Sequence, residues 1–413
     1  MRKHVFLFLI LLAGLCLFAS DAFCETAPDI TSDASISVSR GKKELRHVLD
    51  GDYRTHWSDK GANAFIRFDL PKDKPCYGLY VALAQNLTAF DLQVLKNGEW
   101  VTVPVSGERL NRQYLPVGEG ATSVRLFAKK KGLTLCSVRL FGEGDLPSDV
   151  EVFDAPCEKA DLMLIVTHPD DDILWFGGLL PTYAGELKMN VQVVYMTSHG
   201  AFRKMELLDG LWHCGVHNAP ILAGFDDIPN IGKTAVFNSW GGKRHVVEYL
   251  AGLIRRFQPE VIVTQDEHGE YLHGAHLAMV SAVKEAVPKA ADESWSRGGL
   301  PAWQTKKLYL HLYGKDPLIL NWSKPLAAFG GETGMDLARE AYLCHVSQQN
   351  HLHAVEDSGP YDCRKMGLYF SSVGEDVNKD GLFEHIPALY AKEIGASAAA
   401  DGTTVPSGTS GGV

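Results

Sequence analysis

The sequence predicts two domains, an all-β sandwich followed by an α/β domain with an open, mostly parallel sheet. Residues 30–145 consist of short runs with alternating apolar residues, such as "AFIRFDL" and "SVRLFA". Residues 158–393 instead alternate apolar strand-like runs with longer helix-like segments. A connector rich in Gly, Pro and Asp, "FGEGDLPSDVEVFDAP", separates the two patterns. A chain of 413 residues also exceeds what one hydrophobic core usually holds.

The first 24 residues have the pattern of a secretory signal peptide. The basic start "MRKH" precedes the apolar run "VFLFLILLAGLCLFA" and then small residues. This run is shorter than the roughly 20 residues that a spanning helix needs. We therefore expect an exported protein without a membrane span, either secreted or in the cell envelope or periplasm. A lipid anchor at Cys24 is the alternative, although Phe23 fits a lipidation signal poorly.

The predicted sandwich is indicated by strands of period two that Gly, Pro, Asn and Asp separate, with no sustained helical period. The pieces "VLDGDYRTHWSD", "AFIRFDL", "NGEWVTV" and "TSVRLFA" resemble, in that order, the coagulation-factor type C (discoidin) or galactose-binding-like domain. The resemblance implies carbohydrate binding at the loops of one end and a structural Ca²⁺ near the Asp-rich turn. Asp50 and Asp52 are also good turn formers, which is the alternative to calcium binding.

The predicted α/β domain has strands in "LMLIV", "VQVVYM", "EVIVTQ" and "KKLYLHLY". The helix-like segments "FRKMELLDGLWHCG", "HVVEYLAGLIRRF" and "HLAMVSAVKEAV" lie between them. Strands that take turns with helices predict parallel pairing, and ligands of such sheets bind beyond the carboxyl ends of the strands. Residues 394–413 are small and polar, so we expect a disordered tail.

Two strand ends of this domain carry side chains that bind metal ions. His168 and Asp171 follow "LMLIV" three residues apart, and His273 and His276 follow "EVIVTQ" at the same spacing. Imidazole and carboxylate are ligands of Zn²⁺, and a catalytic zinc keeps three protein ligands and one open position. A divalent cation would also offset the repulsion within the aspartate run "HPDDD".

The motifs "THPDDD", "RKME", "GEYLHGAH" and "CHVSQQ" resemble, in order, those of the PIG-L/LmbE-like zinc-dependent deacetylases, whose fold is Rossmann-like. The first motif departs mildly at Thr167 and Asp172. The resemblance implies the following roles: His168, Asp171 and His276 as metal ligands, Asp170 as general base, His273 as oxyanion stabiliser or general acid, and Arg203 as a substrate contact.

The predicted function is therefore that of an exported zinc-dependent hydrolase that removes the N-acetyl group from an N-acetylated sugar or glycan. One alternative is a glycan-binding adhesin whose α/β domain binds metal without turnover. Another is a metal-dependent amidase that acts on a non-sugar N-acyl substrate. The formal net charge of −10 disfavours nucleic acids and anionic membranes as partners. The sequence leaves the oligomeric state open.

Six cysteines lie beyond the predicted signal peptide, and none of them forms a C-x-x-C pair. A cysteine-ligated structural zinc is therefore disfavoured. An oxidising compartment would allow three disulfides. By domain, we expect Cys76 to pair with Cys136 and Cys344 with Cys363.

Overall fold

The computed structural model of the chain describes residues 25–400, except 85–89, 106–108, 131, 198–199, 229–231, 297 and 350–352. For residues 396–400 only the backbone is described. The predicted signal peptide and the end of the predicted tail lie outside the described residues. Within the described part, none of the helices combines the length and the hydrophobicity of a membrane span.

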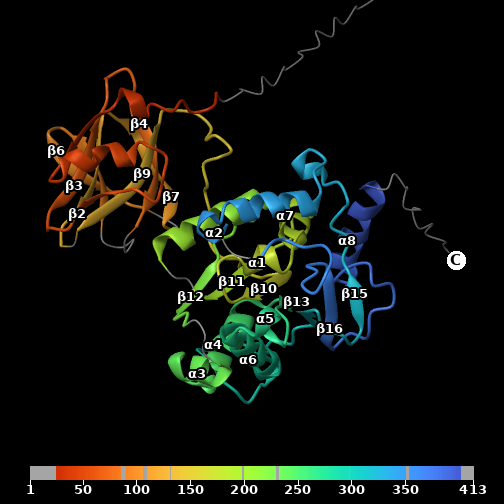
Figure 1. Cartoon of the computed structure of the whole chain (residues 1–413). Coiled ribbons are helices and arrows are strands. Elements are labelled where there is room, and N and C mark those ends of the chain that lie inside the picture. The colour runs from red at the N-terminus through yellow and green to blue at the C-terminus, as the bar shows by residue number, and fades with distance from the viewer. Residues whose placement is uncertain are drawn as a thin grey trace, which may run out of the picture.

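The N-terminal part is a sandwich of two antiparallel sheets (Figure 1). One sheet has the order β1 (Ser35–Val38), β3 (Ala64–Asp69), β8 (Ser123–Ala128), β5 (Asp91–Lys96), β6 (Glu99–Val103). The other has the order β2 (Trp57–Asp59), β9 (Leu133–Phe141), β4 (Cys76–Leu83), β7 (Arg112–Ala121). The short 3₁₀ helices η1 (Thr31–Asp33) and η2 (Lys42–Val48) accompany them. Alternate residues of β3, such as Ile66 and Phe68, belong to one buried apolar cluster with Leu79 and Val81 of β4, so the core lies between the sheets.

The C-terminal part is built on one seven-stranded sheet. Its order is β12 (Ile221–Phe225), β11 (Val191–Thr197), β10 (Leu162–Val166), β13 (Val261–Thr264), β14 (Lys307–His311), β16 (Lys365–Ser371), β15 (Pro317–Ile319). The strands from β12 to β14 are parallel, and β16 and β15 pair antiparallel at one side. This arrangement is the open, mostly parallel α/β sheet that the sequence predicts.

Helices cover both faces of this sheet (Figure 1). They are α1 (Asp171–Leu174), η3 (Pro181–Glu186), α2 (Ala201–His213), α3 (Lys233–Ser239), α4 (Lys243–Phe257), α5 (Gly269–Leu272), α6 (Gly274–Ala291), η4 (Ala327–Phe329), α7 (Gly334–Leu343), η5 (Val346–Gln348) and α8 (Pro387–Ala400). Successive residues of β10 belong to opposite layers: Leu164 packs on the side of α2 and α7, Ile165 on the side of α4 and α6. A strand buried on both faces explains the continuous apolar run "LMLIV".

The chain reverses direction across the sheet between β10 and β13. From β10 it proceeds to β11 and β12 on one side, then returns to β13 and β14 on the other. The helices that follow the two central strands therefore diverge and leave a crevice beyond the strand ends. In doubly wound sheets this switch point is where ligands bind.

The expected disulfides are absent, because all six described cysteines are free thiols. Cys76 begins β4, whereas Cys136 lies opposite the end of that strand, beside Ala82 and Leu83. About seven residues of strand at ~3.3 Å each separate the two thiols. Cys363 contacts Met335 at the start of α7, whereas Cys344 lies at its end. Pairing by domain was wrong because neither pair meets across the fold.

The end of the chain also differs from the expected tail. Helix α8 continues to Ala400, past the predicted start of the disordered segment at residue 394. Its last turns contain several alanines, which have the highest intrinsic helix propensity.

Candidate active site

The ends of β10 and β13 are joined by hydrogen bonds at the switch point. The Gln265 side-chain oxygen, just after β13, accepts from the Thr167 backbone N–H at 2.9 Å and from its hydroxyl at 2.7 Å. These bonds fix the loop from His168 to Asp171 relative to the loop that leads into α6. The two predicted motifs are therefore held face to face.

Three predicted ligands direct donor atoms toward one another at this point. His168 Nδ1 and His276 Nε2 are 2.9 Å apart, and Asp171 Oδ2 lies 3.2 Å and 3.3 Å from them. Tetrahedral zinc with bonds of about 2.0–2.1 Å requires its ligand atoms to be roughly 3.3 Å apart. All three side chains are buried. The spacing and the donor types thus fit a zinc ion.

Neighbouring side chains orient two of these ligands. Trp175 Nε1 donates to Asp171 Oδ1 at 2.7 Å, which turns the other carboxylate oxygen toward the histidines. Glu270 Oε2 lies 2.7 Å from His276 Nδ1. A proton on Nδ1 shared with Glu270 leaves the Nε2 lone pair facing the centre, the usual carboxylate–histidine–metal arrangement.

The electrostatics of the centre favour a positive charge. Burial alone would lower the pKa of His276, but Asp171 and Glu270 raise it to about 10. Burial opposes ionisation of Asp171, yet His276 and His168 hold its pKa well below the usual range. A metal cation bound between these side chains would replace the positive charge that the proton on His276 otherwise supplies.

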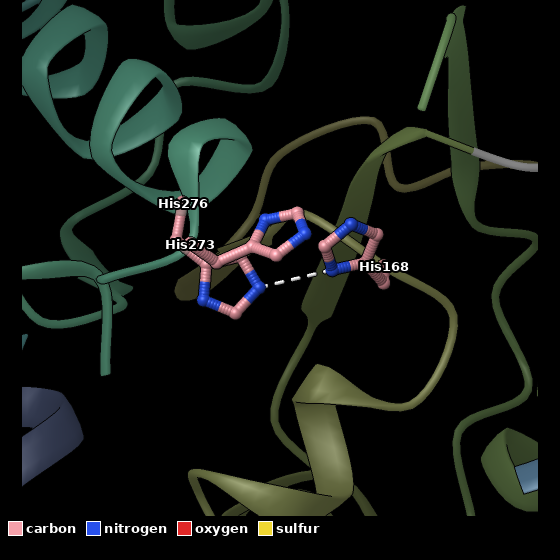
Figure 2. A group of neighbouring side chains, drawn as sticks. All are labelled: His168, His273 and His276. Atoms are coloured by element: carbon pink, nitrogen blue, oxygen red, sulfur yellow. Dashed lines mark hydrogen bonds between the residues drawn. The ribbon is translucent and has the colours of Figure 1, made fainter. Parts of the chain in front are cut away.

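His273 lies beside the other two histidines (Figure 2). Ligand atoms of His168, His273 and His276 lie within 4.8 Å of one another, a wider limit than the 2.9–3.3 Å that separates the atoms of His168, Asp171 and His276. Asp171 Oδ2 lies within 3.3 Å of both partners, and its other oxygen is already bonded to Trp175. We therefore assign Asp171 as the third ligand and leave His273 to face the cavity.

The protonation state of His273 follows from its environment. Its Nδ1 accepts the Ala275 backbone N–H at 3.3 Å as the N-cap of α6, which places the ring proton on Nε2. Burial, reinforced by His168 and His276, lowers its pKa to about 4. At neutral pH the ring is uncharged and offers one N–H donor.

Asp170 and Arg203 form an ion pair beside the centre. Arg203, from the first turn of α2, donates to Asp170 Oδ1 at 3.0 Å. Asp170 precedes α1, but its side chain makes no capping hydrogen bond to that helix. Burial raises the pKa of Asp170 against the opposing effect of Arg203. The carboxylate is therefore available for a role other than helix capping.

A cavity of about 260 Å³ is lined by every predicted site residue except His276, which is fully buried. Pockets for drug-sized ligands are typically ~300–1,000 Å³, so this cavity is large enough for one small molecule or for one part of a larger ligand. Sequence reasoning missed seven further lining residues: Leu174, Trp175, Asp227, Tyr271, Tyr342, Gln348 and His353. Tyr271 lies in the motif "GEYLHGAH", and its ring stacks on that of His353 at 4.7 Å. Gln348 lies in the motif "CHVSQQ", whereas the other five residues lie outside the four motifs.

The fold and the site thus define an α/β domain with a His/Asp centre at the switch point of its sheet. Residues 163–287 match the family model described as PIG-L, GlcNAc-PI de-N-acetylase. A 1D-myo-inositol 2-acetamido-2-deoxy-alpha-D-glucopyranoside deacetylase of Thermobifida fusca (strain YX) is 30% identical over 176 residues. That alignment covers 36% of this chain and 60% of the relative. These matches support a deacetylase domain of the PIG-L family within the α/β part.

Two solved structures are each similar to part of the chain. N,N'-diacetylchitobiose deacetylase from Pyrococcus horikoshii has a TM-score of 0.36 and 20% identity, covering 47% of this chain and 72% of its own. A CBM32 protein produced by Clostridium perfringens has a TM-score of 0.25 and 16% identity, covering 28% of this chain and 99% of its own.

Proposed function

We propose that this protein is a zinc-dependent N-deacetylase that acts on an N-acetylated sugar. The observation that carries the proposal is the convergence of His168 Nδ1, His276 Nε2 and Asp171 Oδ2 at 2.9–3.3 Å beside Asp170. The sugar as substrate class is supported by the PIG-L match and by the named activity of the Thermobifida relative.

Bound zinc would supply a nucleophilic water of lowered pKa and a Lewis acid for the acetyl carbonyl. Asp170 accepts the proton of the attacking water, and Arg203 holds that carboxylate in place. His273 donates its Nε2–H to the oxygen that becomes negative in the tetrahedral intermediate. A ring that is neutral at pH 7 suits this donor role better than that of a cationic acid. The proton that the departing amine needs is then the one that Asp170 took from the attacking water.

The test is acetate release by the zinc-loaded full chain from N-acetylglucosamine, N,N'-diacetylchitobiose and an N-acetylated amino acid. We expect release from at least one saccharide and little from the amino acid. Release from the amino acid alone would contradict the sugar class. Absence of release from all three by a zinc-loaded, folded protein would contradict the activity.

We further propose that the sandwich binds a glycan and that the protein is exported. A hollow of about 580 Å³ on the sandwich combines charged, imidazole and hydroxyl groups, and its lining includes Arg54, Thr55 and His56. On a glycan array, full-length protein should bind saccharides, and His56→Ala should weaken that binding. Equal binding by His56→Ala would contradict this location.

Export is tested separately. Mass spectrometry of the exported protein should find residues 1–24 removed.

The calcium expected in the sandwich is not part of the proposal. Asp50 Oδ1 accepts the Asp52 N–H at 2.9 Å, and Asp52 pairs with Arg54 at 2.8 Å. These carboxylates are engaged in turn and ion-pair contacts, which favours the turn-forming alternative.

A further inference from the structure

Helix α2 connects the sandwich to the candidate active site. It carries acidic and basic side chains at three-residue spacing: Arg203, Glu206 and Asp209. Arg203 reaches Asp170 in the site, whereas Asp209 pairs with Arg112 of the sandwich strand β7. One helix thus has contacts with both parts of the molecule.

Buried Glu206, between these two contacts, is shared by groups from both domains. Its Oε1 lies 2.7 Å from the Ser347 backbone N–H and 3.3 Å from the Tyr53 hydroxyl of the sandwich. Its Oε2 accepts the Ser347 hydroxyl at 2.6 Å. Burial, together with Glu206, keeps the pKa of Tyr53 above its usual value, so the hydroxyl retains its proton and donates.

Arg203 stands between two carboxylates. Its terminal nitrogen is 3.0 Å from Asp170, whereas its Nε is 3.9 Å from Glu206 and has no hydrogen-bond partner among the described residues. The guanidinium can therefore keep its hydrogen bond to Asp170 only while other donors supply the hydrogen bonds that the Glu206 carboxylate needs. Tyr53 and Ser347 supply those donors. If one is removed, Glu206 gains attraction for Arg203, since buried carboxylates require compensation.

The contact that presents Tyr53 is also apolar. Met205 of α2 packs with Ala82 and Cys136 of the sandwich, and the rings of Tyr53 and Phe202 lie 6.3 Å apart. The ring can therefore remain in place when its hydroxyl is removed.

We propose that Tyr53 of the sandwich is a positioning residue of the deacetylase site, which acts through Glu206 to keep Arg203 on Asp170. This inference rests on the proposed function and extends it: the sandwich completes the active site as well as carrying a glycan. Tyr53 follows the Asp50–Asp52 turn, at the tip of the sequence motif that resembles galactose-binding-like domains.

The test compares kcat and KM for acetate release by full-length wild type, Tyr53→Phe and the matched control Tyr80→Phe. Tyr80 also lies near the interdomain contact, where its hydroxyl accepts from Arg112 at 3.1 Å, but it does not touch Glu206. Because one hydrogen bond is worth ~1 kcal/mol, Tyr53→Phe should lower kcat about fivefold with little change in KM. Tyr80→Phe should leave both constants near wild type.

A double-mutant cycle identifies the route of the effect. In an Arg203→Met background, Tyr53→Phe should have no further effect on kcat, because its route to the site is gone. Equal losses in both backgrounds, equal losses in both Tyr→Phe variants, or no loss in Tyr53→Phe would overturn the inference.

The result remains distinguishable from failure of the proposed function. If wild type releases no acetate, the function fails, and a crystal structure of Tyr53→Phe then tests the positioning alone. Arg203 should have left Asp170 for Glu206 in that structure. An unmoved guanidinium would contradict the positioning role.

Discussion

Asp170, beyond the end of β10, is not among the three converging donors, and its side chain makes no capping hydrogen bond to α1. Burial raises its pKa against the effect of Arg203, which holds it at 3.0 Å, and its place in the cavity lining exposes it to the reacting groups. Asp170→Asn keeps the shape but cannot act as a base, so kcat should fall by roughly 10² to 10⁴. Zinc content, measured by elemental analysis, should remain near wild type.

The matched control for this substitution is Asp161→Asn. Asp161 precedes the opposite end of β10 and accepts the Asn190 N–H at 2.9 Å, far from the centre. It should retain wild-type kcat. Undiminished acetate release by zinc-loaded Asp170→Asn would contradict the general-base assignment.

Glu270 offers a second test at the residue scale. It bonds His276 Nδ1 at 2.7 Å and adopts a left-handed backbone conformation with φ 50°, an arrangement that is rare outside glycine. Glu270→Gln keeps the size but weakens the orientation and basicity of the ligand. Zinc affinity, measured by competition with a chelator, should fall by about 10- to 100-fold. Unchanged affinity would show that His276 needs no such partner.

At the scale of elements, the sequence located the two halves of the site because the carboxyl ends of neighbouring parallel strands meet. His168 follows β10 and His276 begins α6 after β13, and these strands are adjacent. Asp227 and His353 belong to loops without a periodic signal, so only the folded chain brings them to the cavity. The conformation of Glu270 is likewise set by tertiary contacts.

The cysteine pairs failed for a related reason. Their expected partners were chosen by domain, but a disulfide requires Cα atoms within about 7 Å, which only strand register and helix length decide. The sandwich and the parallel sheet were predictable because the pattern of apolar residues depends on burial. Alternating apolar residues indicate a strand buried on one face, and a continuous apolar run indicates a strand buried on both.

His345, between α7 and η5, should make the stability of the protein depend on pH. His345 is fully buried, and neither ring nitrogen has a hydrogen-bond partner among the described residues. Burial, with a contribution from Arg203, lowers its pKa to about 3. An unfolded His titrates near pH 6.5. The stability that depends on a neutral His345 is therefore fully present above about pH 6.5. It is lost as the pH falls toward the pKa of His345 in the folded protein.

Urea unfolding of the α/β domain should show this loss. Between about pH 7.5 and pH 5 the free energy of unfolding should fall by about 2 kcal/mol through His345. His345→Asn, which does not titrate, should show a correspondingly smaller decrease over that interval. Equal decreases in both proteins would contradict a neutral, buried His345.

At the scale of the whole molecule, Arg112 ties the sandwich to α2 and to the connector. It contacts Asp209 on α2, Glu151 of the connector at 3.4 Å and the Tyr80 hydroxyl. Burial raises the pKa of Glu151 to about 9 despite Arg112. Arg112→Met should leave Asp209 without its cation and lower stability by about 1–3 kcal/mol. Calorimetry should then resolve separate melting of the two parts, and an unchanged thermogram would contradict the coupling.

The central claim is that one zinc ion at His168, Asp171 and His276 makes the site a deacetylase. The most direct measurement is acetate release during titration of zinc into metal-stripped full-length protein. We predict that stripping abolishes release and that activity rises with added zinc until about one ion is bound per chain. His276→Ala should neither bind that zinc tightly nor recover activity. Acetate release that persists after complete removal of metal, or full zinc binding by His276→Ala, would contradict the account.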